Sequence, residues 1–129
     1  MLVDPDSDVW WFHQKFGHDA PSRPTPLSEK TLALRLKLLR EEFGELMEAM
    51  EAGDFVGTVS EAIDLMYVTM GTLVSMGVDA DGPWAEVQRA NMEKEAVDDV
   101  DGVPQKPLKP QGWLPPQIAA ELEKQGWRR

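Results

Sequence analysis

The stretch EEFGELMEAMEAGDFVGTVSEAID, residues 41–64, decides the fold because two helix-forming runs meet in it at a tight turn. Before the turn, apolar residues recur at steps of three and four until Gly53 ends the run. After Asp54, a second run continues to Met76, with Gly77 as its stop. Because only Gly53 and Asp54 connect the runs, the two helices must return as an antiparallel hairpin.

Glycine and proline divide the rest of the chain into further helical segments, and no segment alternates apolar and polar residues as a half-buried strand does. We therefore expect an all-α helical bundle. Its hairpin spans about 28–52 and 55–76, a third helix spans about 83–96, and short terminal helices begin at Ser7 and Pro116. The length of 129 residues favours a single domain over 1–129.

The composition excludes several classes of function. Asp and Glu outnumber Lys and Arg by 23 to 13, and the formal net charge of −10 argues against a nucleic-acid polymer or an anionic membrane as partner. The absence of cysteine excludes disulfides, thiolate metal sites and a cysteine nucleophile. The first residues lack the features of a signal peptide, so we expect a cytoplasmic protein.

Acidic residues occur where the helical pattern calls for apolar ones. The long first helix of the hairpin has a seam at Leu32, Leu36, Leu39, Phe43, Leu46 and Met50, typical of a helix packed against a partner. Glu42 and Glu45 fall within a second apolar stripe beside this seam. In the second helix, Glu61 and Asp64 are the only charged residues, so we expect a buried core helix rather than a membrane span.

The four acids should meet at one height of the hairpin. Counted from the turn, Glu45 lies 8 residues before Gly53 and Glu61 lies 7 after Asp54, while Glu42 and Asp64 stand at 11 and 10. The pairs are level to within about 1.5 Å of helix rise. Carboxylates without His or Cys suit hard cations, and Mg²⁺ or Mn²⁺ is favoured. If the acids instead face solvent in a groove, they bind no divalent ion.

These residues carry a family resemblance. Glu41-Glu42-Phe43-Gly44-Glu45 followed by Glu61-Ala62-Ile63-Asp64 resembles the EExxE…ExxD signature of the MazG-like all-α nucleoside triphosphate pyrophosphatases. Flanking features are also similar to members of that group: Phe12-His13…Phe16-Gly17 before the hairpin, and Asn91-Met92-Glu93-Lys94 with Lys106…Lys109-Pro110 after it. The resemblance is strongest to MazG-like dUTP pyrophosphatases.

The resemblance implies hydrolysis of a nucleoside triphosphate between its α- and β-phosphates, giving the monophosphate and pyrophosphate, with dUTP as the expected substrate. It implies Mg²⁺ or Mn²⁺, more than one ion per site, held by Glu42, Glu45, Glu61 and Asp64. Divalent cations would neutralise the polyphosphate and activate a water. Glu41 could orient or deprotonate that water as a catalytic residue beside Glu42, or it could pair with Arg40 or Arg35.

Substrate-binding candidates lie on either side of the hairpin. For the base, an aromatic residue could stack and Gln14 offers a donor and an acceptor, while His13 matches the family position best. The aromatic candidates are Trp10, Trp11, Phe12 and Phe16. For the phosphates, the resemblance points to Asn91, and Lys94 shares its helical face. Lys106 and Lys109 lie in a loop that could close over the phosphates or stay solvated.

Assembly and two alternatives complete the sequence-based hypothesis. The apolar surface exceeds what the chain could cover alone, and family members are oligomers, so we expect a homodimer, with a tetramer as the other possibility. Within the same fold, phosphoribosyl-ATP or dCTP is an alternative substrate. From another class of protein, the chain could be a helical interaction module whose acids hold a structural divalent ion.

Overall fold

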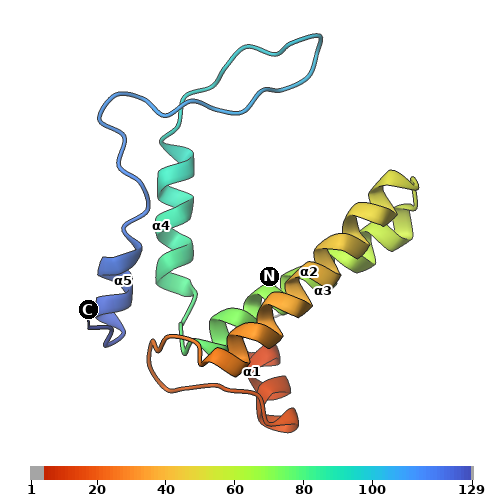
Figure 1. Ribbon diagram of the computed structural model, residues 1–129. Coiled ribbons are helices and arrows are strands. Elements are labelled where there is room, and N and C mark those ends of the chain that lie inside the picture. The colour runs from red at the N-terminus through yellow and green to blue at the C-terminus, as the bar shows by residue number, and fades with distance from the viewer. Residues whose placement is uncertain (1–4, 129) are drawn as a thin grey trace.

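A computed structural model describes residues 5–128 of the chain, and within that range it is all-α, as predicted. The helices in this range are α1 (Pro5–Phe16), α2 (Glu29–Glu51), α3 (Phe55–Ser75), α4 (Asp81–Met92) and α5 (Ile118–Lys124). Figure 1 shows α2 and α3 as a long antiparallel pair, with α4 and α5 forming a separate arm. The fold class predicted from sequence is therefore confirmed.

Local capping explains where the hairpin helices begin and turn. The Ser28 hydroxyl accepts a hydrogen bond from the Thr31 amide at 3.2 Å at the start of α2. The Asp54 carboxylate accepts one from the Gly57 amide at 2.9 Å at the start of α3. Between the helices, Gly53 adopts a φ of 67°, a left-handed conformation that glycine reaches without a Cβ clash. The predicted turn at Gly53 and Asp54 is thus present.

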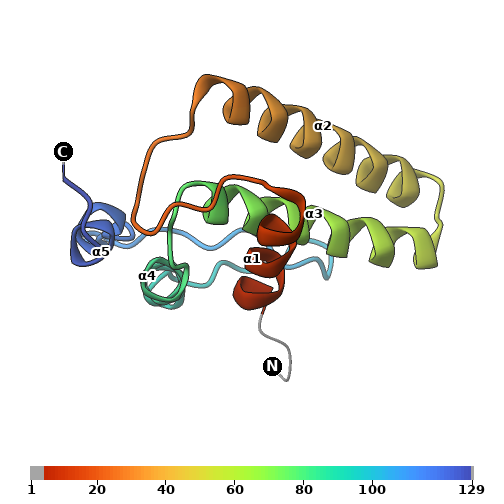
Figure 2. The same cartoon turned by 90° about the horizontal axis from the view of Figure 1, so that it is seen from below.

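Helix α1 packs against α3 on the side away from the turn, as Figure 2 shows. The loop of residues 17–28 then passes the end of α3, where the Thr25 amide donates to the Met76 carbonyl at 2.8 Å. Gly77 is required there, because a Cβ on it would lie 2.3 Å from the carbonyl oxygen of Arg23. Loop 17–28 is therefore held at the end of the hairpin opposite to the turn.

Helices α4 and α5 pack on each other, and neither packs on α1–α3 within the described residues. The Trp113 indole N–H donates to the Ala90 carbonyl at 2.7 Å, and the Gln125 side chain bonds both backbone groups of Asp79. The predicted third helix, 83–96, is wrong at both ends. It begins at Asp81, where the Asp79 carboxylate accepts from the Asp81 amide, and it ends at Met92.

The early end of α4 has a physical cause in the loop that follows. The backbone of Glu95 pairs with that of Leu108 in an isolated antiparallel bridge, with N···O distances of 2.8 and 2.9 Å. These backbone groups are then not available to continue a helix. The terminal helices also differ from the prediction, because α1 already includes Pro5 and α5 starts two residues after Pro116.

The apolar faces of the hairpin are largely uncovered. On α3, Phe55 is 80 % exposed, Ile63 56 % and Met66 57 %, so the expectation of a helix buried nearly all round is wrong for the single chain. The reason is that, among the helices of residues 5–128, only α1 and α2 pack on α3. The predicted seam of α2 is exposed in the same way at Leu32 and Phe43. No helix within residues 5–128 is long and apolar enough to cross a membrane.

Candidate metal centre

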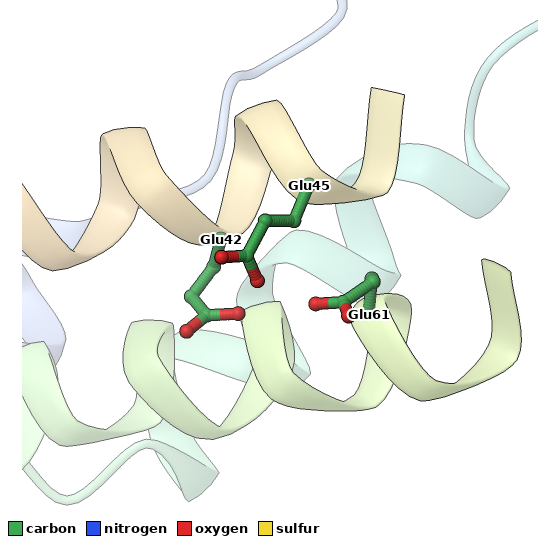
Figure 3. A group of neighbouring side chains, drawn as sticks. All are labelled: Glu42, Glu45 and Glu61. Atoms are coloured by element: carbon green, nitrogen blue, oxygen red, sulfur yellow. The ribbon is translucent and has the colours of Figure 1, made fainter. Parts of the chain in front are cut away.

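Three carboxylates meet between α2 and α3. Glu42 and Glu45 extend from α2 and Glu61 from α3, and one oxygen of each lies within 4.8 Å of the others (Figure 3). The antiparallel return of the hairpin brings them to the same height, as the residue count from the turn predicts. All three donors are hard oxygen ligands, which suits Mg²⁺ or Mn²⁺.

The electrostatics of the cluster fit a bound cation. One buried oxygen of Glu42 and one of Glu61 have no hydrogen-bond partner in the described structure. Burial, then the charge of Glu45, raises the pKa of Glu42. A hydrogen bond with Glu45, burial and the neighbouring carboxylates together raise the pKa of Glu61 to about 6. Like charges held together in this way are relieved by a divalent cation, so the residues present fit the predicted metal.

The other two predicted acids lie at the edge of this group. Asp64 is not among the three residues whose oxygens come within 4.8 Å of one another, but its charge raises the pKa of both Glu42 and Glu61. Asp64 and Glu42 also line the same cavity. Glu41 is exposed beside the cluster, and its charge contributes to the raised pKa of Glu42. The ligand role of Asp64 and the catalytic role of Glu41 stay predictions.

The cavity beside the carboxylates is formed by α1, α2 and α3. It has a volume of about 390 Å³, within the range of small-molecule sites. Phe12, Leu34, Leu38, Tyr67 and Val68 supply most of its apolar wall. The rings of Phe12 and Tyr67 meet edge to face, with centroids 5.6 Å apart. The cavity therefore combines an apolar interior with carboxylates at one end.

The other end of the cavity carries a buried arginine. Arg35 is 4 % exposed, and its Nη2 lies 3.1 Å from His18 Nδ1. Its Nε is buried without a hydrogen-bond partner, and no ion pair joins it to a carboxylate within residues 5–128. The possible Glu41–Arg35 pair is thus wrong. Burial lowers the pKa of this guanidinium from its usual range.

Two of the candidates for base binding line the cavity, Phe12 and the more deeply buried His13. His13 is 1 % exposed, and its Nδ1 lies 2.9 Å from the Asp19 carbonyl oxygen. Burial is the main cause that lowers the pKa of His13. Gln14 and Phe16 are exposed and do not line this cavity, although the Phe16 ring packs on Phe12 with centroids 4.6 Å apart.

The candidates for phosphate binding are not brought to the cavity within the single chain. Asn91 is exposed on α4, and α5 is the only helix in the described part of the chain that packs on α4. The ammonium groups of Lys94 and Lys109 lie over the Trp113 ring, 5.6 and 5.1 Å from its centroid. Lys106 is exposed in the loop between α4 and α5. Their roles at the substrate stay predictions.

Sequence reasoning missed Arg35 as a cavity residue. A signal was present, because positions 35, 38, 42 and 45 recur at steps of three and four and so share one face of α2. The acids of that face were recognised as exceptional among apolar residues. Arg35 lies two turns earlier on the same face, so the same periodicity could have identified it as a neighbour of the acids.

Comparison with known proteins agrees with this geometry. The family model for phosphoribosyl-ATP pyrophosphohydrolase matches residues 9–91, a range that holds α2, α3 and all four predicted metal ligands. An uncharacterised protein of Acanthamoeba polyphaga mimivirus is 28 % identical over 89 residues. That alignment covers 64 % of this chain but 36 % of the relative, so the chain spans about a third of the relative's length. The chain belongs to the phosphoribosyl-ATP pyrophosphohydrolase family, within the MazG-like all-α nucleoside triphosphate pyrophosphatases.

Proposed function

We propose that this protein is a metal-dependent nucleoside triphosphate pyrophosphohydrolase. It cleaves between the α- and β-phosphates, so that a nucleoside triphosphate and water give the monophosphate and pyrophosphate. The observation that carries the proposal is the cluster of Glu42, Glu45 and Glu61, whose oxygens lie within 4.8 Å of one another. Two of its buried oxygens have no hydrogen-bond partner, and the whole cluster lies inside the range matched by the family model.

Each residue of the cluster has a defined task in this proposal. Glu42, Glu45, Glu61 and Asp64 hold Mg²⁺ or Mn²⁺, with more than one ion in the site. The ions supply charge neutralisation and a more acidic water when bound. Glu41, exposed next to the cluster, orients that water or accepts its proton. The apolar wall of the cavity keeps bulk water from the nucleoside.

The substrate that we propose is dUTP, which makes the protein a house-cleaning enzyme of the nucleotide pool. Phosphoribosyl-ATP is a second candidate, because the matched family model carries that name. The two are separated by measuring pyrophosphate release from each under the same Mg²⁺ concentration. A larger kcat/KM for phosphoribosyl-ATP than for dUTP would reverse this choice of substrate.

The working form that we propose is a homodimer in the cytoplasm. The exposed apolar residues of α2 and α3 form the surface that a second copy would cover, since large uncovered apolar patches are rare on monomers. Sedimentation equilibrium should give a mass of twice 14.5 kDa. A mass of 14.5 kDa at micromolar concentration would contradict the dimer but not the proposed activity.

The experiment that tests the activity is pyrophosphate release from each dNTP with Mg²⁺ or Mn²⁺. Glu45→Gln removes one ligand charge at nearly constant volume, so it should reduce release by about 100-fold or more, since even residues behind the ligands contribute 10–100-fold. Glu48→Gln is the matched control, because Glu48 is exposed on the same helix outside the cluster. Release from no dNTP and not from phosphoribosyl-ATP, or unchanged release in Glu45→Gln, would overturn the proposal.

A further inference from the structure

The only buried residue of α2 is an arginine. This helix carries leucines along two stripes, yet Arg35 is the one residue of Glu29–Glu51 that is buried. Burying a guanidinium without a compensating partner is costly, and proteins rarely do so without a function. Its one hydrogen bond runs to His18, and its buried Nε has no partner in the described structure. The Nε group of Arg35 can therefore donate to a group that residues 5–128 do not supply.

The neighbouring helix is adapted to this arginine. Gly71 of α3 lines the same cavity, and a Cβ on it would lie 2.6 Å from Arg35 Nη1 and 3.1 Å from His13 Nε2. A glycine inside a helix costs about 1 kcal/mol relative to alanine, so the position is unfavourable for α3 alone. The missing side chain makes room for the guanidinium between α2 and α3.

Arg35 lies too far from the carboxylates to contact the phosphates that they would hold through metal. It precedes Glu42 by seven residues, which is two turns and about 10 Å of helix rise along the same face. The guanidinium lies against Gly71, which is seven residues beyond Asp64 on α3, so it is not at the height of the acids. In a nucleotide whose phosphates lie at the carboxylates, the part that reaches this distance is the base.

The chemistry of the guanidinium defines which base edge it can meet. Its N–H groups are all donors and it has no acceptor, so it pairs with a carbonyl oxygen and not with an amino group. The keto pyrimidines, uracil and thymine, carry an oxygen at position 4, whereas cytosine carries an amino group there. The apolar wall of Phe12, Tyr67 and Val68 suits the faces of a pyrimidine ring.

We propose that Arg35 is a specificity-determining residue whose guanidinium donates to the oxygen at position 4 of a keto pyrimidine base. Gly71 provides the space that the guanidinium occupies, and His18 positions it. Cytosine is rejected because its amino group would face a donor and leave both groups unpaired in a buried site. This inference rests on the proposed hydrolysis of nucleoside triphosphates.

The test compares kcat/KM for dUTP, dTTP and dCTP in the wild type, Arg35→Gln and Arg35→Lys. We expect the wild type to prefer dUTP and dTTP over dCTP by about 10-fold or more. Arg35→Gln introduces an acceptor beside its donor, so the ratio of dUTP to dCTP should fall by about 10-fold. Arg35→Lys, which keeps a donor only, should retain part of the preference. Lys37 is an exposed cation on the same helix, so Lys37→Gln should leave kcat/KM unchanged for all three substrates.

A second measurement does not depend on the folding of any variant. The wild type is given the triphosphate of a deoxyribosyl 2-pyrimidinone, which lacks the oxygen at position 4 but keeps the ring, the sugar and the phosphates. We expect its kcat/KM to be lower than that of dUTP by about 10-fold or more. Hydrolysis of this analogue at the rate of dUTP would overturn the role of Arg35.

The outcomes separate this inference from the proposed function. A wild type that releases pyrophosphate but prefers dCTP, or Arg35 variants that lose all dNTPs by the same factor, would overturn the inference alone. Equal loss for every base would instead indicate a contact to phosphate or a purely structural arginine. A wild type that releases pyrophosphate from no dNTP and not from phosphoribosyl-ATP would overturn the proposed function, and with it the proposed role of Arg35 in base selection.

Discussion

The two ends of the cavity between α1, α2 and α3 differ in the sign of their charge. The acid end consists of Glu42 and Asp64 in the cavity wall, with Glu45 and Glu61 clustered around Glu42. The arginine end consists of Arg35, His18 and Gly71. At the acid end, carboxylates raise one another's pKa; at the arginine end, a single cation is buried without an ion pair. The two ends are about 10 Å apart along the helices and do not neutralise each other.

Within residues 5–128, neither end forms an ion pair that balances its charge. Clustered carboxylates are destabilising until a cation joins them, and a buried guanidinium is destabilising until acceptors face it. A metal-bound nucleotide carries both kinds of partner, with cations at its phosphates and carbonyl oxygens on its base. In the proposed function, the phosphates would therefore lie toward the turn of the hairpin and the base toward loop 17–28.

The largest expected effect comes from breaking the acid end. Glu61→Gln should weaken Mn²⁺ binding and pyrophosphate release by about 100-fold, because Glu61 supplies the only α3 oxygen in the three-carboxylate group. Isothermal titration with Mn²⁺ measures the affinity without requiring activity. Glu51→Gln, an exposed acid near the end of α2, serves as the control. Unchanged Mn²⁺ affinity in Glu61→Gln would show that the cluster is not the metal site.

A smaller effect is expected from crowding the arginine end. Gly71→Ala places a Cβ 2.6 Å from Arg35 Nη1, so the guanidinium must shift. We expect the ratio of kcat/KM for dUTP and dCTP to fall by about 10-fold, and the free energy of unfolding to fall by about 1–3 kcal/mol. Urea unfolding and parallel pyrophosphate assays measure the two effects.

The matched control for this substitution is Gly44→Ala. Gly44 is also a helical glycine, but a Cβ on it meets nothing within 4 Å. The substitution should leave the unfolding free energy unchanged or raise it by about 1 kcal/mol, because alanine favours the helix. Equal losses of stability in both variants would show that the close approach of Arg35 to Gly71 is not the cause of the lower free energy of unfolding.

The pH dependence of folding stability distinguishes Glu61 at the acid end from His13, because the two groups change the stability in opposite directions as pH rises. The folded state raises the pKa of Glu61 from 4.5 to about 6, so without metal this group contributes less stability as pH rises through that interval. The lowered pKa of His13 acts in the other direction, because folded stability is lost as pH falls below about 6.5. The difference in Tm between wild type and Glu61→Gln isolates the carboxylate.

Calorimetry in a chelating buffer from pH 4.5 to 7 measures that difference. Relative to Glu61→Gln, the wild type should lose stability as pH rises to about 6 and then remain level. Adding Mn²⁺ above pH 6 should raise the Tm of the wild type, because the metal binds the deprotonated carboxylate of the folded state. A wild type that parallels Glu61→Gln at every pH would contradict the raised pKa.

The acid end was predictable from sequence, whereas the arginine end was not. Glu42, Glu45 and Glu61 were placed together by helical periodicity and by a count of residues from a short turn, both of which are local rules. The neighbours of Arg35 come from α1, loop 17–28 and α3. No periodicity in one segment predicts where a long loop brings His18.

The errors in the predicted fold have the same origin, because they also depend on contacts between segments that are distant in the sequence. The extent of α4 depends on the pairing of Glu95 with Leu108 across a loop, and the exposure of α3 depends on what else packs on it. Composition identified α3 as an apolar helix, and burial nearly all round was the expectation that followed. Composition could not show that Phe55 and Ile63 are exposed in the single chain.

The smallest effect is expected from loosening the loop that carries His18. The Thr31 hydroxyl donates to the Asp19 carboxylate, while the Asp19 carbonyl lies 2.9 Å from His13 Nδ1. Thr31→Val removes one exposed hydrogen bond, so the free energy of unfolding should fall by about 0.5–1.5 kcal/mol. Because Arg35 stays packed at Gly71, the ratio of dUTP to dCTP hydrolysis should change by about twofold at most, equivalent to well under 1 kcal/mol. Thr25→Val, which removes a hydroxyl bonded within the same loop, is the control. A change of selectivity as large as that of Gly71→Ala would assign base discrimination to loop 17–28 rather than to the guanidinium.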